Sequence, residues 1–160
     1  QLAWSRAEEI MRLPPRAPAR AKLTVTLNAA GGIDALVTRI AVPPTNHEVR
    51  DRLFDNSPAD VAQRAAAGNS DAAAVEGAAS SYAIRHMAVD HCPADIGLPT
   101  GRWRGNADSY TAFFTECFVD EMATRAGSDA LSYRMAMLGN ATLPARCLLT
   151  VTSPGGWADG

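Results

Sequence analysis

Few side chains that could carry chemistry lie near one another in this sequence. His86 and His91 bracket a segment that reads as a strand, and Cys92 follows directly. Neighbouring strand residues point to opposite faces, and so do residues an odd number of positions apart. A metal site or a Cys–His nucleophile pair needs converging side chains, so this spacing argues against both. A hydrolase built on His91 or Cys92 is therefore the least favoured function.

Other reactive residue types give no site either. The cysteines Cys92, Cys117 and Cys147 are odd in number and far apart, so we expect small buried thiols. Asp120 and Glu121 are adjacent and would diverge by about 100° on a helix, which predicts a solvated helix face. No glycine-rich phosphate loop follows a strand. The sequence offers no catalytic residue and no metal ligand of its own.

One segment has the composition of a ligand-binding loop. Gly97 to Asp108 reads GLPTGRWRGNAD and leads into an apolar helical pattern. Glycines permit close approach of a ligand to the backbone, free amides at a helix start attract anions, and Arg102 and Arg104 add positive charge. This predicts an anion-binding loop. The alternative is a sharp surface turn whose Trp103 packs on the core.

Composition limits the class of protein. The chain has 160 residues, of which 47% are hydrophobic, and a formal charge of −2. That suffices for one domain, residues 1–160, with a core. Arginines are scattered, and a nucleic-acid surface would need a basic stripe, so no nucleic-acid partner is expected. The start of the sequence has no leader pattern, and we expect any signal peptide of a parent protein to lie outside this chain.

The strand pattern in the first half predicts a β-hairpin. Residues 22–27 alternate, which puts Leu23, Val25 and Leu27 on the core side. Residues 28–32, NAAGG, then form a five-residue turn before a second strand over 33–42. A further strand is expected over residues 82–92.

The helices are predicted from apolar periodicity and capping residues. Ser57 should cap a helix with Pro58 at its first position, ending near Ala67. Residues 109–126 should form the longest helix, and Asp129 should cap a short one through Leu138. In the long helix the apolar residues expected to be buried are Phe114, Phe118 and Met122. We therefore predict an α+β fold: a small antiparallel sheet with a β-hairpin, and helices packed mainly on one face.

Several segments, in order along the chain, carry a family resemblance. Trp103-Arg104-Gly105, followed by residues 113–123 (FFTECFVDEMA), resembles the large-subunit signature of the xanthine dehydrogenase/aldehyde oxidase family. The resemblance is closest to the isoquinoline 1-oxidoreductase β-subunit branch, which includes aldehyde dehydrogenase large subunits. Residues 4–11 are similar to an Arg-acidic-acidic-Met strand end in that family. The other similar segments are residues 19–23, 28–32, 75–78 and 82–84.

The resemblance implies that the chain is an internal fragment of a molybdopterin-binding subunit. The complete enzyme would be a molybdenum hydroxylase that oxidises an aldehyde or an N-heterocycle with water as oxygen source. The implied cofactor-binding residues are Trp103, Arg104, Gly105 and Asn106, beside the molybdenum cofactor (molybdopterin). The implied partners are the remaining domains of the large subunit and an iron–sulfur small subunit, in the bacterial cytoplasm or periplasm. The isolated chain is expected to be inactive and to carry no cofactor.

The sequence also departs from the family at the loop. Many relatives have an aromatic residue and then a glycine where this chain has Asn106 and Ala107, and purine-binding relatives have an upstream arginine that is absent near Ala73. The family's glutamate base and iron–sulfur cysteines belong to other regions. A second hypothesis is therefore a cofactor-free structural or interaction domain of the same fold, in which Arg104 folds back onto a carboxylate such as Asp108.

Overall fold

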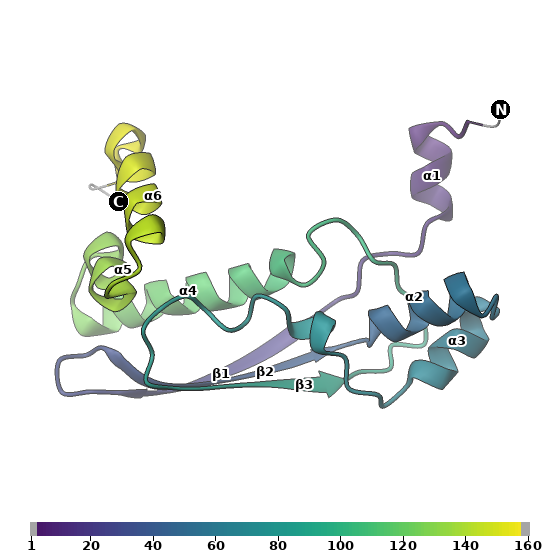
Figure 1. Cartoon of the computed structure of the whole chain (residues 1–160), viewed down its shortest axis with the longest axis horizontal. Helices are drawn as coiled ribbons and strands as arrows, with labels where there is room; N and C mark the ends of the chain where they lie inside the picture. Colours follow the sequence, from purple (N-terminus) through teal and green to yellow (C-terminus); the bar gives the residue numbers. More distant parts are fainter. Residues whose placement is uncertain (1–2, 158–160) are drawn as a thin grey trace. The chain divides into compact units, whose positions relative to one another are not determined.

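The computed structural model describes residues 3–157 and confirms an α+β fold (Figure 1). Strands β1 (Arg20–Leu27), β2 (Ile33–Val42) and β3 (His86–Pro93) pair in the order β1-β2-β3. The first two form the predicted antiparallel hairpin, but β3 runs parallel to β2, so the sheet is mixed and not antiparallel. The long connection between β2 and β3 carries helices, and such a crossover is what a parallel pair requires.

The hairpin turn is built around Asn28. Its side-chain Oδ1 accepts hydrogen bonds from the N–H groups of Ala30 (2.9 Å) and Gly32 (3.0 Å). Gly31 has a φ of 81° and approaches Ala126 so closely that an added Cβ would lie 2.9 Å from the Ala126 Cβ. The strand before the turn alternates as predicted, with Leu23, Val25 and Leu27 facing the core.

The chain divides into two compact units, each made of three separate stretches of sequence. Unit 1 contains the chain up to Ala21, Arg39–Glu76 and Asp90–Ser109. Unit 2 contains Lys22–Thr38, Gly77–Val89 and the chain from Tyr110 onward. Every strand passes from one unit into the other, so neither unit corresponds to a continuous segment.

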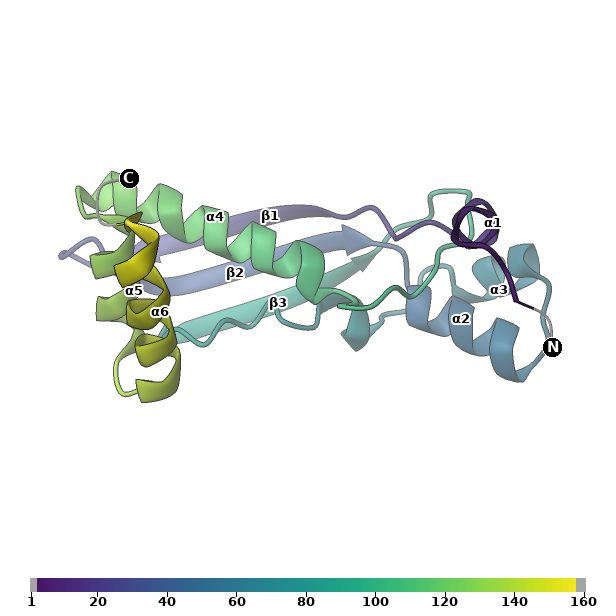
Figure 2. The same ribbon diagram turned by 90° about the horizontal axis from the view of Figure 1, so that it is seen from above.

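In unit 2, helix α4 (Asp108–Ala126) covers one face of the strands (Figures 1 and 2). Helices α5 (Ala130–Leu138) and α6 (Thr142–Gly155) follow it. The predicted cap and stop of α5 are confirmed: the Asp129 side chain accepts from the Ser132 N–H at 2.8 Å, and the helix ends at Gly139. The core of this unit comes from the strands, α4 and α5, and consists of Ile33, Leu36, Val119, Met122, Ala123, Tyr133 and Met137.

The buried stripe of α4 differs from the prediction. Met122 is buried, but Phe114 and Phe118 are only half-buried, and the buried positions include Thr111, Thr115 and Val119. The buried stripe is therefore rotated around the helix relative to the predicted one, and the two share Met122. Threonine can occupy it because the Thr115 hydroxyl donates to the Thr111 carbonyl at 2.9 Å, within the helix itself.

In unit 1, two helices differ from what the sequence predicted. The resemblance made residues 4–11 a strand end, but they begin helix α1 (Arg6–Arg12). Ser5 and Glu8 form a capping box there, with reciprocal backbone and side-chain hydrogen bonds. Helix α2 (Thr45–Phe54) was not predicted, because its polar sequence has no apolar period.

The remaining boundaries are small corrections. Helix α3 (Ala59–Ala66) has Pro58 at its N-cap, so Ser57 lies outside it and makes no capping bond. A short 3-10 helix, η1 (Ala72–Val75), lies between α3 and β3. Strand β3 starts four residues late, because the Ala83 N–H donates to Met137 in α5 at 2.7 Å instead of joining the sheet. Within residues 3–157, no helix is long and apolar enough to cross a membrane.

Candidate anion-binding site

The loop Gly101–Asn106, here called the arginine loop, is held in unit 1 by the segment Pro14–Arg16. Arg16 and Gly101 form a parallel bridge, and the Gly101 N–H donates to the Pro15 carbonyl at 2.9 Å. The Trp103 indole N–H donates to the Pro14 carbonyl at 3.0 Å. A Cβ at Gly101 would lie 2.6 Å from that same carbonyl oxygen, so this crossing requires glycine.

Arg16 fixes the carbonyl groups of the loop. One guanidinium nitrogen donates to the Asn106 carbonyl (3.0 Å) and the Ser109 hydroxyl (2.8 Å), and the other donates to the Arg104 carbonyl (3.0 Å). The N–H groups of Arg104 and Gly105 have no hydrogen-bond acceptor within residues 3–157. The turn therefore keeps two backbone donors available to a ligand.

Asn106 shapes the end of the loop. Its φ is 34°, in the left-handed region where asparagine is among the more tolerated side chains, and Gly105 before it has a φ of 83°. The Asn106 side chain donates to the Ala73 carbonyl at 2.9 Å and to the Glu76 carboxylate at 3.2 Å. Ala107, which follows, is fully buried. Asn106 and Ala107, the two positions at which the loop differs from the pattern it resembles, thus form the end of the turn.

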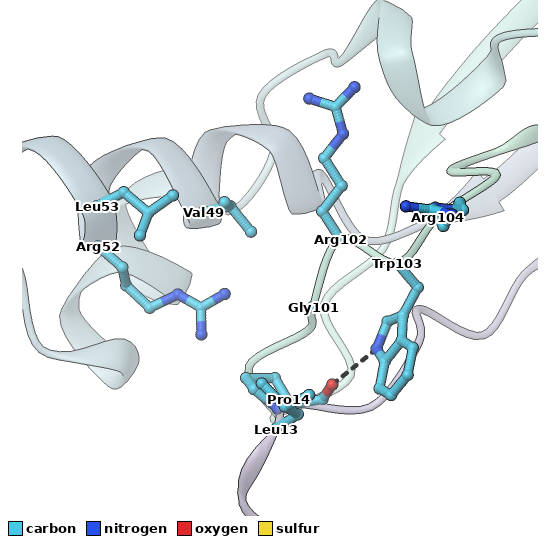
Figure 3. A pocket seen from close by; sticks show the side chains of 9 residues that line it. All are labelled: Leu13, Pro14, Val49, Arg52, Leu53, Gly101, Arg102, Trp103 and Arg104. Carbon is cyan, nitrogen blue, oxygen red and sulfur yellow. Dashed lines mark hydrogen bonds between the residues drawn. The ribbon is translucent and has the colours of Figure 1, made fainter. Parts of the chain in front are cut away.

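A pocket of about 370 Å³ lies beside the loop (Figure 3). Its apolar part comes from α2 and the segment before Pro15, and its charged part from three arginines. The lining residues are Leu13, Pro14, Val49, Arg52, Leu53, Gly101, Arg102, Trp103 and Arg104. No carboxylate lines the pocket, so its field is positive.

The three arginines differ in how firmly they are held. Arg52 donates to the Thr100 carbonyl at 2.6 Å, and Arg102 donates to the Asn46 side chain at 2.9 Å. Arg104 is exposed, and no carboxylate among residues 3–157 lies within 4.0 Å of its guanidinium. Asp108 does not pair with it, contrary to the expectation for the cofactor-free domain. Arg104 therefore has an uncompensated charge to offer an anion.

A buried carboxylate of α2, that of Glu48, is engaged with Thr100 and not with these arginines. Glu48 in α2 is 2% exposed. Its carboxylate accepts from the Thr100 N–H at 2.8 Å and from the Thr100 hydroxyl at 3.1 Å, and that hydroxyl also contacts Thr45 at 2.7 Å. This buried network attaches α2 to the residue that precedes the arginine loop.

His91 has a structural part in the same unit. Its Nδ1 accepts from the Asp71 N–H at 2.9 Å, so the proton is on Nε2, which donates to the Val42 carbonyl at 3.0 Å. The Asp71 carboxylate in turn accepts from the Asn46 N–H in the first turn of α2, at 2.9 Å. Both ring nitrogens are occupied, while His86 is exposed. Among the described residues, no three His, Cys, Asp or Glu side chains converge as metal ligands.

The prediction that the cysteines are buried was wrong, because Cys92, Cys117 and Cys147 are all exposed. Cys92 lies on the outward side of β3, where the burial of side chains alternates. Cys117 lies on α4 outside the buried stripe, and α6 buries only Thr152. An apolar side chain therefore did not predict burial at these positions.

Sequence reasoning missed an ion-pair cluster in unit 2. The Arg134 side chain is 5% exposed and donates to the carboxylates of Glu116 (3.0 Å) and Asp120. Tyr82 donates its hydroxyl to Glu116 at 2.9 Å. Burial lowers the pKa of Arg134, but the hydrogen bonds to Asp120 and Glu116 outweigh it, so the pKa lies above its usual range. Asp120 is therefore paired and not merely solvated, and its spacing of four from Glu116 was the available signal.

The comparisons with known proteins identify no family. No family model matches the chain, and no curated protein gives a significant match. The functional argument therefore rests on the site and on the residues of the loop.

Proposed function

We propose that this chain is part of the large subunit of a molybdenum hydroxylase, and that its arginine loop faces the molybdenum cofactor. The main support is the pocket beside the loop, which has three arginines and no carboxylate in its lining. The two unpaired amides of the turn add hydrogen-bond donors to that positive field.

The residues present fit an anionic group such as this cofactor, which carries a phosphate and a dithiolene. Arg104 and the N–H groups of Arg104 and Gly105 would hold it. Gly105 has open space where a Cβ would stand, so the backbone is accessible there. Trp103 and Asn106 would keep the turn in shape through their bonds to Pro14 and Ala73. When bound, the cofactor supplies the redox chemistry.

The wider reaction follows from the resemblance. The complete enzyme would oxidise an aldehyde or an N-heterocycle with water as oxygen source. The base and the iron–sulfur clusters would come from the rest of the large subunit and from a small subunit, and these are also the proposed partners. What this chain contributes is positive charge and fixed hydrogen-bond donors at one wall of the cofactor site.

The test is made in the complete enzyme, purified from a host that makes the cofactor. Arg104→Ala should lower the molybdenum content per polypeptide and the turnover of benzaldehyde with a dye acceptor. The unfolding midpoint should hardly change, because the Arg104 side chain makes no ion pair with any carboxylate within residues 3–157. Arg64→Ala is the matched control, an exposed arginine in the same unit that pairs only with Asp60.

Full molybdenum content and full turnover in Arg104→Ala would contradict the proposal and favour the cofactor-free domain. The same loss in Arg64→Ala would also contradict it, because the effect would then follow from removing any surface charge. A loss confined to Arg104→Ala would support the proposal.

A further inference from the structure

We infer that unit 2 contains a second, separate binding site, which takes a small organic cation: a protonated amine on a compact apolar body. The site is a pocket of about 370 Å³ bounded by the segment before β3, by α4 and by the start of α6. Its lining residues are Gly77, Ala79, Ser80, Ser81, Tyr82, Ala112, Thr115, Glu116, Leu138, Pro144 and Leu148. The volume falls in the range typical of small-molecule sites.

Glu116 is the one charged residue in this lining, and its carboxylate is held in place. Oε2 accepts from the Tyr82 hydroxyl at 2.9 Å and from Arg134 Nε at 3.0 Å. Arg134 Nη2 also donates to the Glu116 backbone carbonyl at 3.1 Å. Oε1 accepts no hydrogen bond within residues 3–157, and the side chain is 46% exposed. A ligand N–H can therefore reach a carboxylate oxygen that is already oriented.

The charge balance of the cluster favours a cation. One guanidinium, that of Arg134, faces the two carboxylates of Glu116 and Asp120, so a negative charge remains uncompensated. Tyr82 does not change this balance at neutral pH, because burial and the neighbouring Glu116 raise its pKa to about 12 and keep it a neutral donor. No lysine, arginine or histidine lines the pocket. An anion would therefore meet only repulsion there.

The rest of the wall defines the remainder of the ligand. Leu138, Pro144 and Leu148 contribute apolar side chains to the lining. The polar part of the lining consists of Ser80, Ser81, Tyr82, Thr115 and Glu116. An ammonium group on a small hydrocarbon body matches both parts of the lining.

The experiment titrates the full chain with benzylammonium and follows amide shifts by ¹H–¹⁵N NMR. Signals of Ser80, Ser81 and Glu116 should shift with a dissociation constant on the order of 1 mM, as expected for a ligand of this size. Benzyl alcohol, which is neutral and similar in shape, should bind about tenfold more weakly because it lacks the charge-assisted hydrogen bond. Benzoate should not bind.

Two variants and one control keep the result unambiguous. Glu116→Gln should weaken benzylammonium binding about tenfold. Should Glu116→Gln not fold, Ala112→Leu decides: it keeps Glu116, Asp120 and Arg134, fills the pocket from α4 and should abolish binding. Glu121→Gln removes an exposed carboxylate outside the pocket and should leave binding unchanged. Equal affinity for the alcohol and the amine, or unchanged binding in Ala112→Leu, would overturn the inference.

Discussion

At the scale of single residues, polar side chains decide the conformation of the arginine loop. Arg16 binds two carbonyl groups of the turn, and Asn106 adopts the left-handed conformation while its amide reaches Ala73 and Glu76. The N–H groups of Arg104 and Gly105 are available to a ligand because they have no acceptor within residues 3–157, while the carbonyls of Arg104 and Asn106 are bound by Arg16. The Arg104 side chain thus supplies the positive charge, whereas Arg16 and Asn106 fix the shape of the turn.

The pKa of Tyr82 should reflect the charges of the Glu116–Arg134 cluster. Burial, and then the negative charge of Glu116, raise its pKa to about 12 from an ordinary value of 10.0. The folded-state pKa is the higher one, so the stabilising effect is complete below about pH 10 and is lost as the pH rises through about 12. Tyrosinate absorbance at 295 nm should therefore include a late component that disappears in Tyr82→Phe.

Glu116→Gln is the informative companion, because it removes the charge and keeps a hydrogen-bond acceptor. The late component should then move to lower pH, since one of the two main causes of the shift is gone. A Tyr82 midpoint near 10 in the unmodified chain would contradict the geometry of the cluster. Tyr133 also titrates late because of burial, so the comparison must be made by difference between variants.

Residue-level roles were the hardest to predict from the sequence. Their types and spacing did predict that Trp103, Arg104 and Gly105 lie in a turn before the long helix. Asn106 and Arg16 were not recognised as its supports, because they are 90 residues apart and only the fold brings them together. The same holds for Arg134, whose partners lie on a different helix. Spacing within one element cannot report such contacts.

At the scale of elements, prediction succeeded where the pattern was local. The hairpin, α4 and α5 follow from strand alternation, apolar spacing and capping residues. Helix α2 has no apolar period. Its first turn is satisfied by Asp71 from a distant segment, and it is anchored through the bonds between Glu48 and Thr100. A helix supported by distant polar contacts cannot be recognised from its own sequence.

The stripe of α4 gives a stability ranking that tests the packing. Met122 is 8% exposed and belongs to the core of unit 2, whereas Phe114 is half-buried and packs on Tyr110 and Phe113. Met122→Ala should therefore lower the free energy of unfolding by about 2–5 kcal/mol through the cavity that it leaves. Phe114→Ala should cost less, about 1–2 kcal/mol, although phenylalanine is the larger side chain.

Urea denaturation of the two variants, compared with the unmodified chain, measures this difference. The opposite ranking would mean that Phe114 lies in the core, as the apolar spacing alone suggested. Thr124→Ala is a suitable control on the same helix, because its exposed hydroxyl bonds only to the carbonyl of Asp120.

At the scale of the whole molecule, the two units are assembled from interleaved stretches of chain. Unit 1 needs Asp90–Ser109 as well as Arg39–Glu76, since Thr100 binds Glu48 and His91 binds both Asp71 and Val42. Sequence patterns could not predict this division, because they report on neighbours along the chain. The parallel placement of β3 beside β2 was missed for the same reason.

The interleaving predicts that residues 1–76 do not fold by themselves. Such a fragment keeps Glu48, Asp71 and the helices of unit 1 but loses Thr100 and His91. Helix α2 would then lose the bonds between Glu48 and Thr100 that anchor it, and an isolated helix of this length is marginal in water. The ¹H–¹⁵N spectrum of fragment 1–76 should show little dispersion.

A fragment of residues 1–109 contains all three stretches of unit 1 and should give dispersed signals that include Thr100. A well-dispersed spectrum from 1–76 would show that the network of Glu48, Thr100, Asp71 and His91 is dispensable, and that α2 and α3 are stabilised by their mutual packing alone.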